Sequence, residues 1–483
     1  MMVTSAFSCT ASAVLGGCGL LLICLWSVIF DNFLTLRNNS LIYRYWKNEP
    51  LDIHADFYFF NWTNPEDFYD LSVKPKFEEV GPYSFLQKIE KTNITWNDND
   101  TVTFQQKKFW IFQKQKGGVH LKDPIVTLNP IPLITSYLLR DWNYYTRRVI
   151  SMTLSTFFGE HHMTQTVESL LFKGYYEPLM KIAAATPMLS QYDLPNWEGF
   201  GYFYDVTTEK GKNADFGYIH FWNYQNKSRY FDDACGDVRG SAEYYFPKNL
   251  KKNILKYFMP DMAGSTNLTF EKEESVSSIL GYKYVIGEKT LDNGTNYPEN
   301  RCLCSGECVP SGTINMTRLR HSLPVFVSLP HFYKADPYYI NLVDGLEPNK
   351  SKHDFYVIVE PTTGIPLKGN MALQANLLVQ PVSGLTGKKK RRTTTEAQIA
   401  LLASPQGQGV IGLHSPKPPG LGPGYHETVS VKNPRSPPEA IQNPRTCAGD
   451  AINPVSLRRS RAPHVHYELC VIYLQFYLDV QSL

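Results

Sequence analysis

Four cysteines lie close enough together in the central part of the sequence to do joint chemistry. Cys302, Cys304 and Cys308 fall within seven residues, and Cys235 precedes them. In an oxidising compartment such an even-numbered group forms two disulfide bonds, whereas in the cytosol the Cys-x-Cys-x3-Cys spacing is compatible with a metal site. The compartment of the protein therefore decides what these thiols do.

Asparagines in glycosylation sequences indicate that compartment. Nine of them occur as Asn-x-Ser/Thr without proline, and none follows residue 349. They are Asn38, Asn61, Asn93, Asn99, Asn226, Asn267, Asn293, Asn315 and Asn349. Nine such sequences confined to one part of the chain, together with the clustered cysteines, favour a body that is lumenal or extracellular.

Basic side chains accompany two predicted helical stretches. Arg140 and Arg147 lie seven residues apart on the first stretch, with Arg148 adjacent, and Lys173 and Lys181 belong to the second. Seven residues are nearly two turns, so Arg140 and Arg147 share one helix face. Both a solvated face and an anion-binding face fit this pattern.

His161 and His162 follow the sequence Phe-Phe-Gly-Glu. Histidines can titrate between neutral and endosomal pH, so the pair is a candidate switch for ligand release, and a loop pair without such a role is the simpler interpretation. Gly-Glu-His-His is not His-Glu-x-x-His, so it predicts no zinc geometry. The sequence also lacks G-x-S-x-G, a P-loop and G-x-G-x-x-G, and we predict no enzyme activity, no metal and no cofactor.

Residues 11–30, ASAVLGGCGLLLICLWSVIF, predict a membrane anchor. These twenty residues carry no charge, and at about 1.5 Å per residue they span the roughly 30 Å hydrocarbon core. A cleaved signal peptide is the alternative, but no small-x-small cleavage site ends the stretch. Three basic residues between 37 and 47 would place the body in the cytosol by the positive-inside rule. We follow the glycosylation sequences, so residues 1–10 are predicted to be cytosolic and 11–30 to form a transmembrane helix.

Strand patterns precede and follow a helical stretch in the body. Alternating or aromatic-rich runs extend from Leu51 to about Phe112 and return after about residue 187. Between 132 and 187, apolar residues recur at helical spacing, and the stripe consists of Leu138, Trp142, Tyr145, Val149 and Met152. Regular βαβ alternation is missing, so the sequence predicts an α+β domain with an antiparallel sheet or barrel and a helical cap at about 132–187.

Five stretches of the body occur in an order that is specific to one family. They are FYFFNWTNPEDF (57–68), KPKFEEVGPYSF (74–85), VTLNPIPL (126–133), the run from ENRCLCSGEC to PVFVSLPHFYKADP (299–337), and DGLEPNKSKHDFYVIVEPTTGIPL (344–367). They cover roughly residues 30 to 381, and through them the chain resembles the class B scavenger receptors.

The resemblance implies an antiparallel β-barrel ectodomain with an inserted helical-bundle cap and a hydrophobic tunnel, in the plasma membrane or an endosomal or lysosomal membrane. It implies that lipids, fatty acids, lipoproteins or other polyanionic ligands bind at the helical apex, where the five basic residues named above would suit phosphates and carboxylates. A trafficking or adhesion receptor that binds a protein partner at the apex is the alternative function.

The resemblance also implies the disulfide pairing Cys235–Cys302 and Cys304–Cys308. Family members often have a further pair, whose positions in this chain are near Ala263 and Arg320. Both cysteines of that pair are missing together, which leaves no unpaired thiol in the ectodomain.

Residues 386–483 do not resemble the family. From Lys388 onward twelve Lys and Arg face six Asp and Glu, so the tail is +6 and the preceding residues are −3, given the net charge of +3. A near-neutral body argues against nucleic-acid binding. Eleven prolines between Pro405 and Pro463 favour a low-complexity, disordered tail after an ectodomain of residues 31–385.

The last strand region and the second membrane helix of the family are not recognisable in this tail. The apolar run from Leu469 to Leu478 spans about 15 Å as a helix, half of a bilayer. We favour an alternatively spliced form or an error in the gene model over a type II protein with a divergent tail. Loss of a barrel strand would leave an unpaired sheet edge.

Overall fold

A computed structural model gives the fold of the chain. It describes Leu25, Leu36, Asn38 and residues 40–48, 53–70, 72–98, 101–113, 118–154, 161–175, 201–202, 206–211, 217–242, 245–320, 323–380, 382, 411–412 and 468–479. The predicted membrane helix at 11–30 lies outside these residues except for Leu25. Within the described ranges, no helix is long and apolar enough to cross a membrane.

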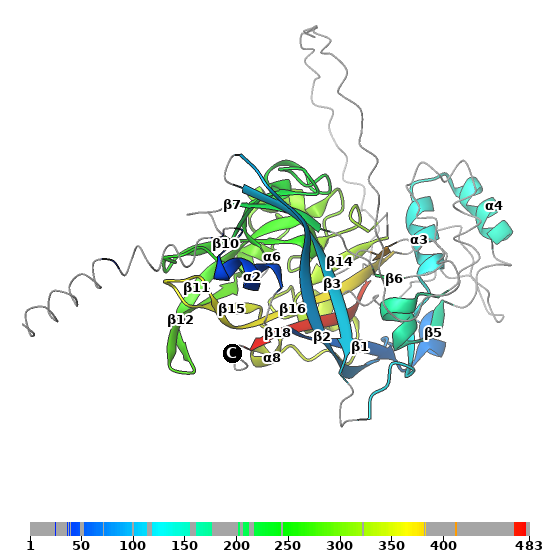
Figure 1. Cartoon of the computed structure of the whole chain (residues 1–483). Helices are drawn as coiled ribbons and strands as arrows, with labels where there is room; N and C mark the ends of the chain where they lie inside the picture. The colour runs from blue at the N-terminus through cyan, green and yellow to red at the C-terminus, as the bar shows by residue number, and fades with distance from the viewer. Residues whose placement is uncertain are drawn as a thin grey trace, which may run out of the picture. The chain divides into compact units, whose positions relative to one another are not determined.

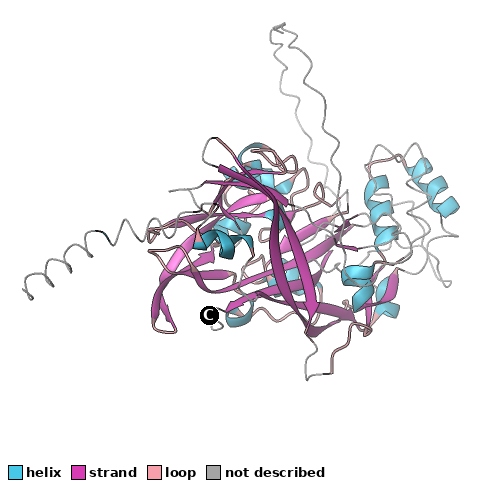
Figure 2. Ribbon diagram, in the orientation of Figure 1, coloured by secondary structure: helices cyan, strands magenta, loops and turns pink. Residues whose placement is uncertain are grey.

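One large sheet of fourteen strands dominates the molecule (Figures 1 and 2). Its strands are β1 (Ile53–Trp62), β2 (Phe77–Trp96), β3 (Thr101–Phe112), β7 (Val206–Gly211), β8 (Tyr218–Trp222), β9 (Gly240–Ala242), β10 (Ile254–Met259), β11 (Gly264–Val276), β12 (Ile279–Ile286), β13 (Ile314–Asn315), β14 (Val325–Ser328), β15 (Tyr356–Val359), β16 (Pro366–Val379) and β18 (Glu468–Asp479). Two small pairs accompany it, β4 (Pro124–Leu128) with β5 (His162–Thr166), and β6 (Gly201–Tyr202) with β17 (Ile411–Gly412).

Helices are short and few among the described residues, and with the sheet they make the fold α+β, as the sequence predicts. They are α2 (Leu41–Lys47), α3 (Pro130–Leu139), α4 (Tyr144–Leu154), α6 (Glu288–Leu291), α7 (Tyr338–Leu342) and α8 (Lys350–His353). Short turns of other helix types are η1 (Pro65–Tyr69), η2 (Ser169–Lys173), η4 (Asp233–Gly236), η5 (Pro260–Met262), η6 (Pro298–Cys304) and η7 (Pro330–Phe332).

Period-two alternation places the core on one face of the strands. In β1 the side chains of Ile53, Ala55, Phe57 and Phe59 are buried, and the intervening side chains are more exposed. Successive side chains of a strand point to opposite faces, so this pattern directs one face of β1 to the core.

Strand β18 joins the two ends of the strand order β16-β15-β12-β11-β10-β9-β8-β7-β3-β2-β1. It pairs with β1, for example Ile53 with Leu478, and with β16, for example Gly369 with Leu478. It is the red strand in Figure 1.

This strand corrects the prediction of disorder for residues 468–479. Twelve residues are too few for a membrane helix, but as a strand at about 3.3 Å per residue they run some 40 Å beside their neighbours. Without β18, one edge of β1 and one edge of β16 would be unpaired. Both edges are hydrogen-bonded to β18.

The sheet is strongly curved. The hydroxyl of Tyr257 in β10 lies 3.6 Å from the sulfur of Met371 in β16, although β11, β12 and β15 separate these strands in the sheet order. At about 4.8 Å per strand, four steps across a flat sheet would place them roughly 19 Å apart. The two strands therefore face each other across the concave side of the sheet.

The predicted apolar helix stripe is wrong in its phase. The helix breaks into α3 and α4, and the side chain of Asn143 caps α4 by accepting a hydrogen bond of 2.9 Å from the backbone of Thr146. Because the break rotates the second helix relative to the first, Tyr145, Val149 and Met152 are 80%, 63% and 61% exposed. The second helical stretch, predicted at about Thr164 to Lys173, also differs, since it contains the end of β5 and the short η2.

Candidate functional site

The structure contains the two disulfide bonds that the resemblance implies. Cys235 in η4 bonds to Cys302 in η6, 67 residues away, and Cys304 bonds to Cys308. The first bond closes a long loop and so restricts the unfolded chain, whereas the second fixes a local turn.

A buried arginine lies where class B scavenger receptors often have a third disulfide bond and this chain has none. Arg320 is 3% exposed and donates a hydrogen bond of 3.2 Å to the backbone carbonyl of Asp261, two residues before Ala263. Burial raises the pKa of the Asp261 carboxyl, and the positive charges of Lys108 and Arg320 oppose that rise. A charge-assisted contact thus joins the two segments that a disulfide would join.

Arg140, a predicted ligand-docking residue, takes part in a structural contact. Its guanidinium forms an ion pair with Glu307, which lies inside the Cys304–Cys308 turn. Glu307 also accepts hydrogen bonds from Gln380 at 2.5 Å and from Tyr137 at 3.3 Å. This Glu307 latch therefore ties the end of α3 to the disulfide turn and to the residue after β16.

The other predicted docking residues differ in solvent exposure. Arg147 donates a hydrogen bond of 3.0 Å to the backbone carbonyl of Arg140, which caps α3. Lys173 is exposed and lies 2.6 Å from Glu168. Arg148 is exposed on α4, and Lys181 is outside the described residues. Arg140 and Arg147 are thus in direct contact with each other.

The predicted glycosylation sites divide by exposure. Asn38, Asn93, Asn226, Asn267 and Asn349 are exposed, Asn61 is half-buried, and Asn99 is outside the described residues. A glycan is attached to the side-chain nitrogen, which must therefore be accessible.

Asn293 and Asn315 do not meet this condition, which corrects the prediction for them. Each is 2% exposed. The side-chain nitrogen of Asn293 donates to the carbonyl of Val309 at 2.6 Å, and that of Asn315 donates to the carbonyl of Cys304 at 2.7 Å. In the folded protein these two amides hold the disulfide region together and have no room for a sugar.

The predicted histidine switch does not fit endosomal pH at His161. The His161 ring packs against Phe68, with 4.5 Å between ring centres, and burial together with the neighbouring His162 lowers its pKa to about 4. His162 lies beside Trp62, at 6.2 Å between ring centres. His162 is thus the first residue of β5 and His161 directly precedes it, and both pack against aromatic side chains rather than lie in an open loop.

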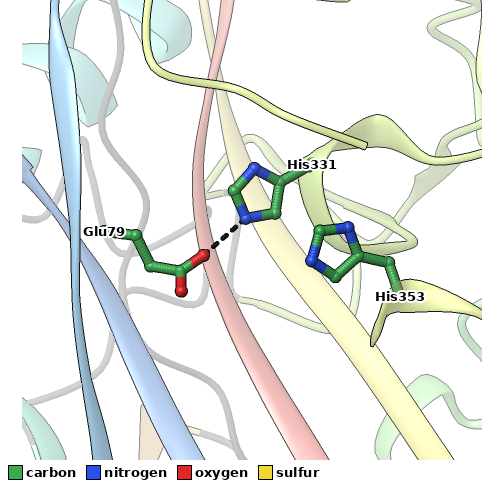
Figure 3. A group of neighbouring side chains, drawn as sticks. All are labelled: Glu79, His331 and His353. Carbon is green, nitrogen blue, oxygen red and sulfur yellow. Dashed lines mark hydrogen bonds and ion pairs between the residues drawn. The ribbon is translucent and has the colours of Figure 1, made fainter. Parts of the chain in front are cut away.

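A second cluster of titratable side chains is not recognisable from the sequence. Glu79 of β2, whose side chain is 33% exposed, meets the buried His331 of η7 and the buried His353 of α8 (Figure 3). The Nε2 atom of His331 donates to the Glu79 carboxylate at 2.6 Å, and the His331 and His353 rings stack in parallel with 4.3 Å between centres. The two histidines are 4% and 2% exposed.

Backbone amides fix the protonation of both rings. Nδ1 of His331 accepts a hydrogen bond of 3.0 Å from the Glu347 amide, and Nδ1 of His353 accepts one of 3.0 Å from the Asn349 amide. A neutral imidazole has one donor and one acceptor nitrogen, so both rings carry their proton on Nε2.

This tautomer does not fit a metal ion. Two histidines and a glutamate are ligands that zinc uses, and one ligand atom of each lies within 4.8 Å of the others. A histidine bound through Nε2 keeps its proton on Nδ1, usually as a donor to a carbonyl or carboxylate. Here both Nδ1 atoms face amide donors, so Nε2 coordination would place two protons against each other.

The electrostatics of the group favour the neutral form of His353. Burial and the neighbouring His331 together lower the pKa of His353 to about 4, against the opposite effect of Glu79. Burial raises the pKa of Glu79, but the hydrogen bond and charge of His331 and the charges of His353 and Lys352 outweigh it, so the net shift is downward. Acid would therefore charge a site that is built for a carboxylate and neutral rings.

Comparison with known proteins identifies the family. The CD36 family model matches residues 8–395, well over half of the chain. The chain belongs to the CD36 family. It is accordingly a membrane protein with an extracellular or lumenal body, and its two disulfide bonds lie in that body.

Individual CD36-family relatives are about 30% identical. The chain is 34% identical over 370 residues to Protein peste of Drosophila melanogaster, an alignment that covers 73% of this chain and 66% of peste. It is 31% identical to scavenger receptor class B member 1 of Bos taurus, covering 72% and 69%, and 31% identical to lysosome membrane protein 2 of Homo sapiens, covering 72% and 73%. The chain thus spans slightly less than two thirds of peste.

The CD36-family match ends before strand β18. Residue 395 lies 16 residues after the end of β16, and β18 begins at Glu468. The place of β18 between β1 and β16 therefore comes from the strand pairing of this chain and not from the family match.

Proposed function

We propose that this CD36-family chain is a membrane receptor without enzyme activity that binds lipids, lipoproteins or other polyanionic ligands at its helical segment and passes lipid through the interior of its sheet. The strand order, which returns from β1 through β18 to β16, then forms a barrel around a tunnel. The observation that carries this proposal is the contact between Tyr257 and Met371 across the enclosed side of the sheet.

The enclosed face of β16 has the chemistry that a lipid tunnel needs. Met371 and Leu373 lie two residues apart, so they share one face of the strand, and both are only partly buried although they pack against the core. Apolar side chains that keep some exposure inside a curved sheet offer a surface for an acyl chain, since burying them against a lipid is favourable.

The helical segment supplies a docking surface of mixed character. Arg148 is exposed on α4 beside the exposed Tyr145 and Met152. A guanidinium next to apolar surface suits a lipid or lipoprotein, which presents phosphates or carboxylates together with acyl chains. Arg140 and Arg147 support this surface through the Glu307 latch and the α3 cap rather than by binding ligand.

Photolabelling with an alkyne-tagged, photoreactive fatty acid tests the tunnel. In full-length chain in cell membranes, we expect adducts on the peptides that contain Tyr257 or Met371, and an excess of untagged fatty acid should remove them. Met371→Trp should reduce both labelling and lipid uptake several-fold because the larger ring fills the enclosed face.

Ile111→Trp is the matched control for this variant. Ile111 is 49% exposed on β3, so the same substitution there adds an indole to an outer surface and should leave labelling unchanged. Labelling that resists competition, or that both variants affect equally, would contradict the tunnel.

A protein-binding receptor is the second candidate function. The exposed apolar residues of α4 favour it, because an aromatic and aliphatic helix face also suits a protein partner. Tyr145→Glu should then abolish capture of a protein partner while fatty-acid labelling of the interior continues. Loss of labelling without loss of a protein partner would favour the lipid receptor instead.

A further inference from the structure

The β11–β12 hairpin projects beyond the strands on either side of it. Strand β10 pairs with β11 only as far as Thr269, and β15 pairs with β12 only from Tyr282 onward. In the described ladders, the ribbon from Glu274 to Gly281 therefore pairs only within itself. A two-stranded ribbon of this kind gains little stability from its own contacts.

The tip of this ribbon carries an exposed aliphatic pair. Ser277 and Ser278 make the turn with φ values of 49° and 68°, and Ile279 and Leu280, which follow directly, are each 48% exposed. Protruding strand ends usually carry charged or polar residues, because apolar ones invite association. An adjacent Ile-Leu pair at a tip therefore indicates a contact outside the domain.

Close packing fixes the direction in which the tip points. A Cβ atom added at Gly281 would lie 2.4 Å from a side-chain carbon of Ile358 in β15 and 3.0 Å from one of Leu367 in β16. The ribbon thus rests directly on its neighbours at its base, so the tip position follows from the strand register.

The register places the tip at the edge of the sheet where the chain enters from its N-terminal part. Ile53, the first residue of β1, pairs with Leu478, which also pairs with Gly369. Pro366 pairs with Val359, and Val359 pairs with Tyr282.

From Gly369 to Pro366 the register moves three residues toward this edge, and from Tyr282 to Ile279 it moves three more. Together these six residues cover about 20 Å at 3.3 Å per residue. The tip therefore extends beyond the start of β1. Helix α2 lies at the same edge, since Asn48, which follows it, bridges to Glu90 of β2, three residues past the partner of Ile53.

The predicted membrane helix at 11–30 places the membrane near this edge. The CD36-family chain is a membrane protein, and the uncharged residues 11–30 precede α2 by only ten residues. Ten extended residues reach at most about 35 Å, so the edge that holds α2 cannot lie far from the bilayer surface.

The chemistry of the tip favours a bilayer over a protein partner. Acidic side chains at the base of the ribbon are paired with lysines, Glu274 with Lys272 and Glu273 with Lys252, each at 2.9 Å, which weakens their repulsion of anionic headgroups. Two side chains are far too little surface for a stable protein interface, which buries upward of about 1,000 Å², whereas shallow insertion of a few aliphatic groups is enough for an interfacial contact on a chain that is already anchored.

We propose that Ile279 and Leu280 insert into the headgroup region of the membrane that holds this chain, so that the β11–β12 hairpin is a second membrane contact. The contact sets the tilt of the domain on the bilayer. It rests on the membrane location of the family and on the predicted membrane helix at 11–30, and not on the proposed passage of lipid.

Site-specific photocrosslinking tests the contact. The full-length chain carries p-benzoylphenylalanine in place of Leu280 in cell membranes that contain an alkyne-tagged phosphatidylcholine. We expect lipid adducts about fivefold or more above those of a chain with the same group in place of Ile111, because a headgroup-depth side chain meets lipid continuously. A level equal to that of the Ile111 control, or an adduct to a protein instead, would overturn the proposal.

Fatty-acid competition separates this result from the tunnel. Excess untagged fatty acid should leave the adduct at position 280 unchanged, because bilayer lipid is not displaced, whereas it removes labelling at Met371. A second variant, Ile279→Asp with the crosslinker at 280, should lower the lipid adduct several-fold by keeping the tip in water. If this variant retains the full adduct, insertion of the aliphatic pair is excluded.

Discussion

Single residues in the Glu79–His331–His353 group show how the fold depends on protonation. Both rings receive backbone amide donors on Nδ1, so a second proton on either ring would remove an acceptor as well as add a buried charge. The residues that donate these amides, Glu347 and Asn349, lie in the segment that leads into α8. Protonation therefore acts on a loop and not only on two side chains.

Acid should destabilise the protein through His353. Its pKa in the folded protein is about 4, below the usual value near 6.5 that it has when unfolded. For such a histidine the stabilisation is complete above pH 6.5 and is lost as the pH falls toward 4, by roughly 2–4 kcal/mol in all. Thermal unfolding of the full-length chain between pH 7.5 and 4 measures this slope.

His353→Asn should flatten that slope. The asparagine oxygen can still accept from the Asn349 amide, but the side chain cannot take up a proton in this range. His120→Asn, at an exposed position, is the matched control and should leave the pH dependence as it is. An unchanged slope in the His353 variant would show that other groups cause the acid sensitivity.

The sequence reveals some of these residues and hides others for physical reasons. Cys235, Cys302, Cys304 and Cys308 are recognisable by type and spacing, because disulfide bonding is a property of the residues themselves. Glu79 and His331 are 252 positions apart, and His331 sits in a left-handed turn with a φ of 52°. Such a meeting depends on loop conformations that local sequence patterns do not specify.

At the level of elements, the Glu307 latch holds the helical segment to the sheet. Arg140 was predicted as a ligand-docking residue from helix spacing and from the family resemblance, neither of which reveals its ion pair with Glu307. The helix ends at Leu139, so Arg140 turns toward Glu307 rather than along the face that Arg147 would share. The burial of Asn293 and Asn315 could not be predicted either, because a glycosylation sequence carries no information on packing.

Breaking the latch should loosen the helices without unfolding the sheet. Glu307→Ala removes the partner of Arg140, Tyr137 and Gln380 together, and it should lower the local opening free energy of α3 by about 1–3 kcal/mol. Hydrogen exchange of the full-length chain should then be roughly tenfold or more faster in residues 130–139, with little change in β2 and β16.

Glu299→Ala is the matched control for this prediction. Glu299 is exposed and forms an ion pair of 2.5 Å with the exposed Lys289, and such surface pairs contribute little to stability. Equal exchange rates in both variants would mean that packing of Ile131, Leu133 and Ile134 holds α3 in place without the latch.

For the whole molecule, β18 is the element on which the continuity of the sheet depends. Removing residues 466–483 should leave β1 and β16 with unpaired edges, and such edges promote aggregation. We expect the truncated chain to elute as large aggregates after detergent extraction and to keep immature, endoglycosidase-sensitive glycans. A chain shortened only by residues 480–483 keeps β18 and should behave as the full-length protein.

A truncated chain that is monomeric and carries mature glycans would contradict this dependence. In that case β1 and β16 would have to be satisfied without β18. The sequence predicted the α+β class from its strand and helix periods, but it missed β18 because a single apolar run of this length fits a strand and a short helix equally well.

The late position of β18 also has a consequence for biosynthesis. Its partners β1 and β16 are made long before it, and 88 residues separate Val379 from Glu468. At about 5–20 residues per second, the ribosome takes several seconds or more to produce that interval, during which both edges are exposed in the lumen. The nascent chain should therefore engage lumenal chaperones until translation has passed Asp479, and slowing translation within residues 380–467 should prolong that association.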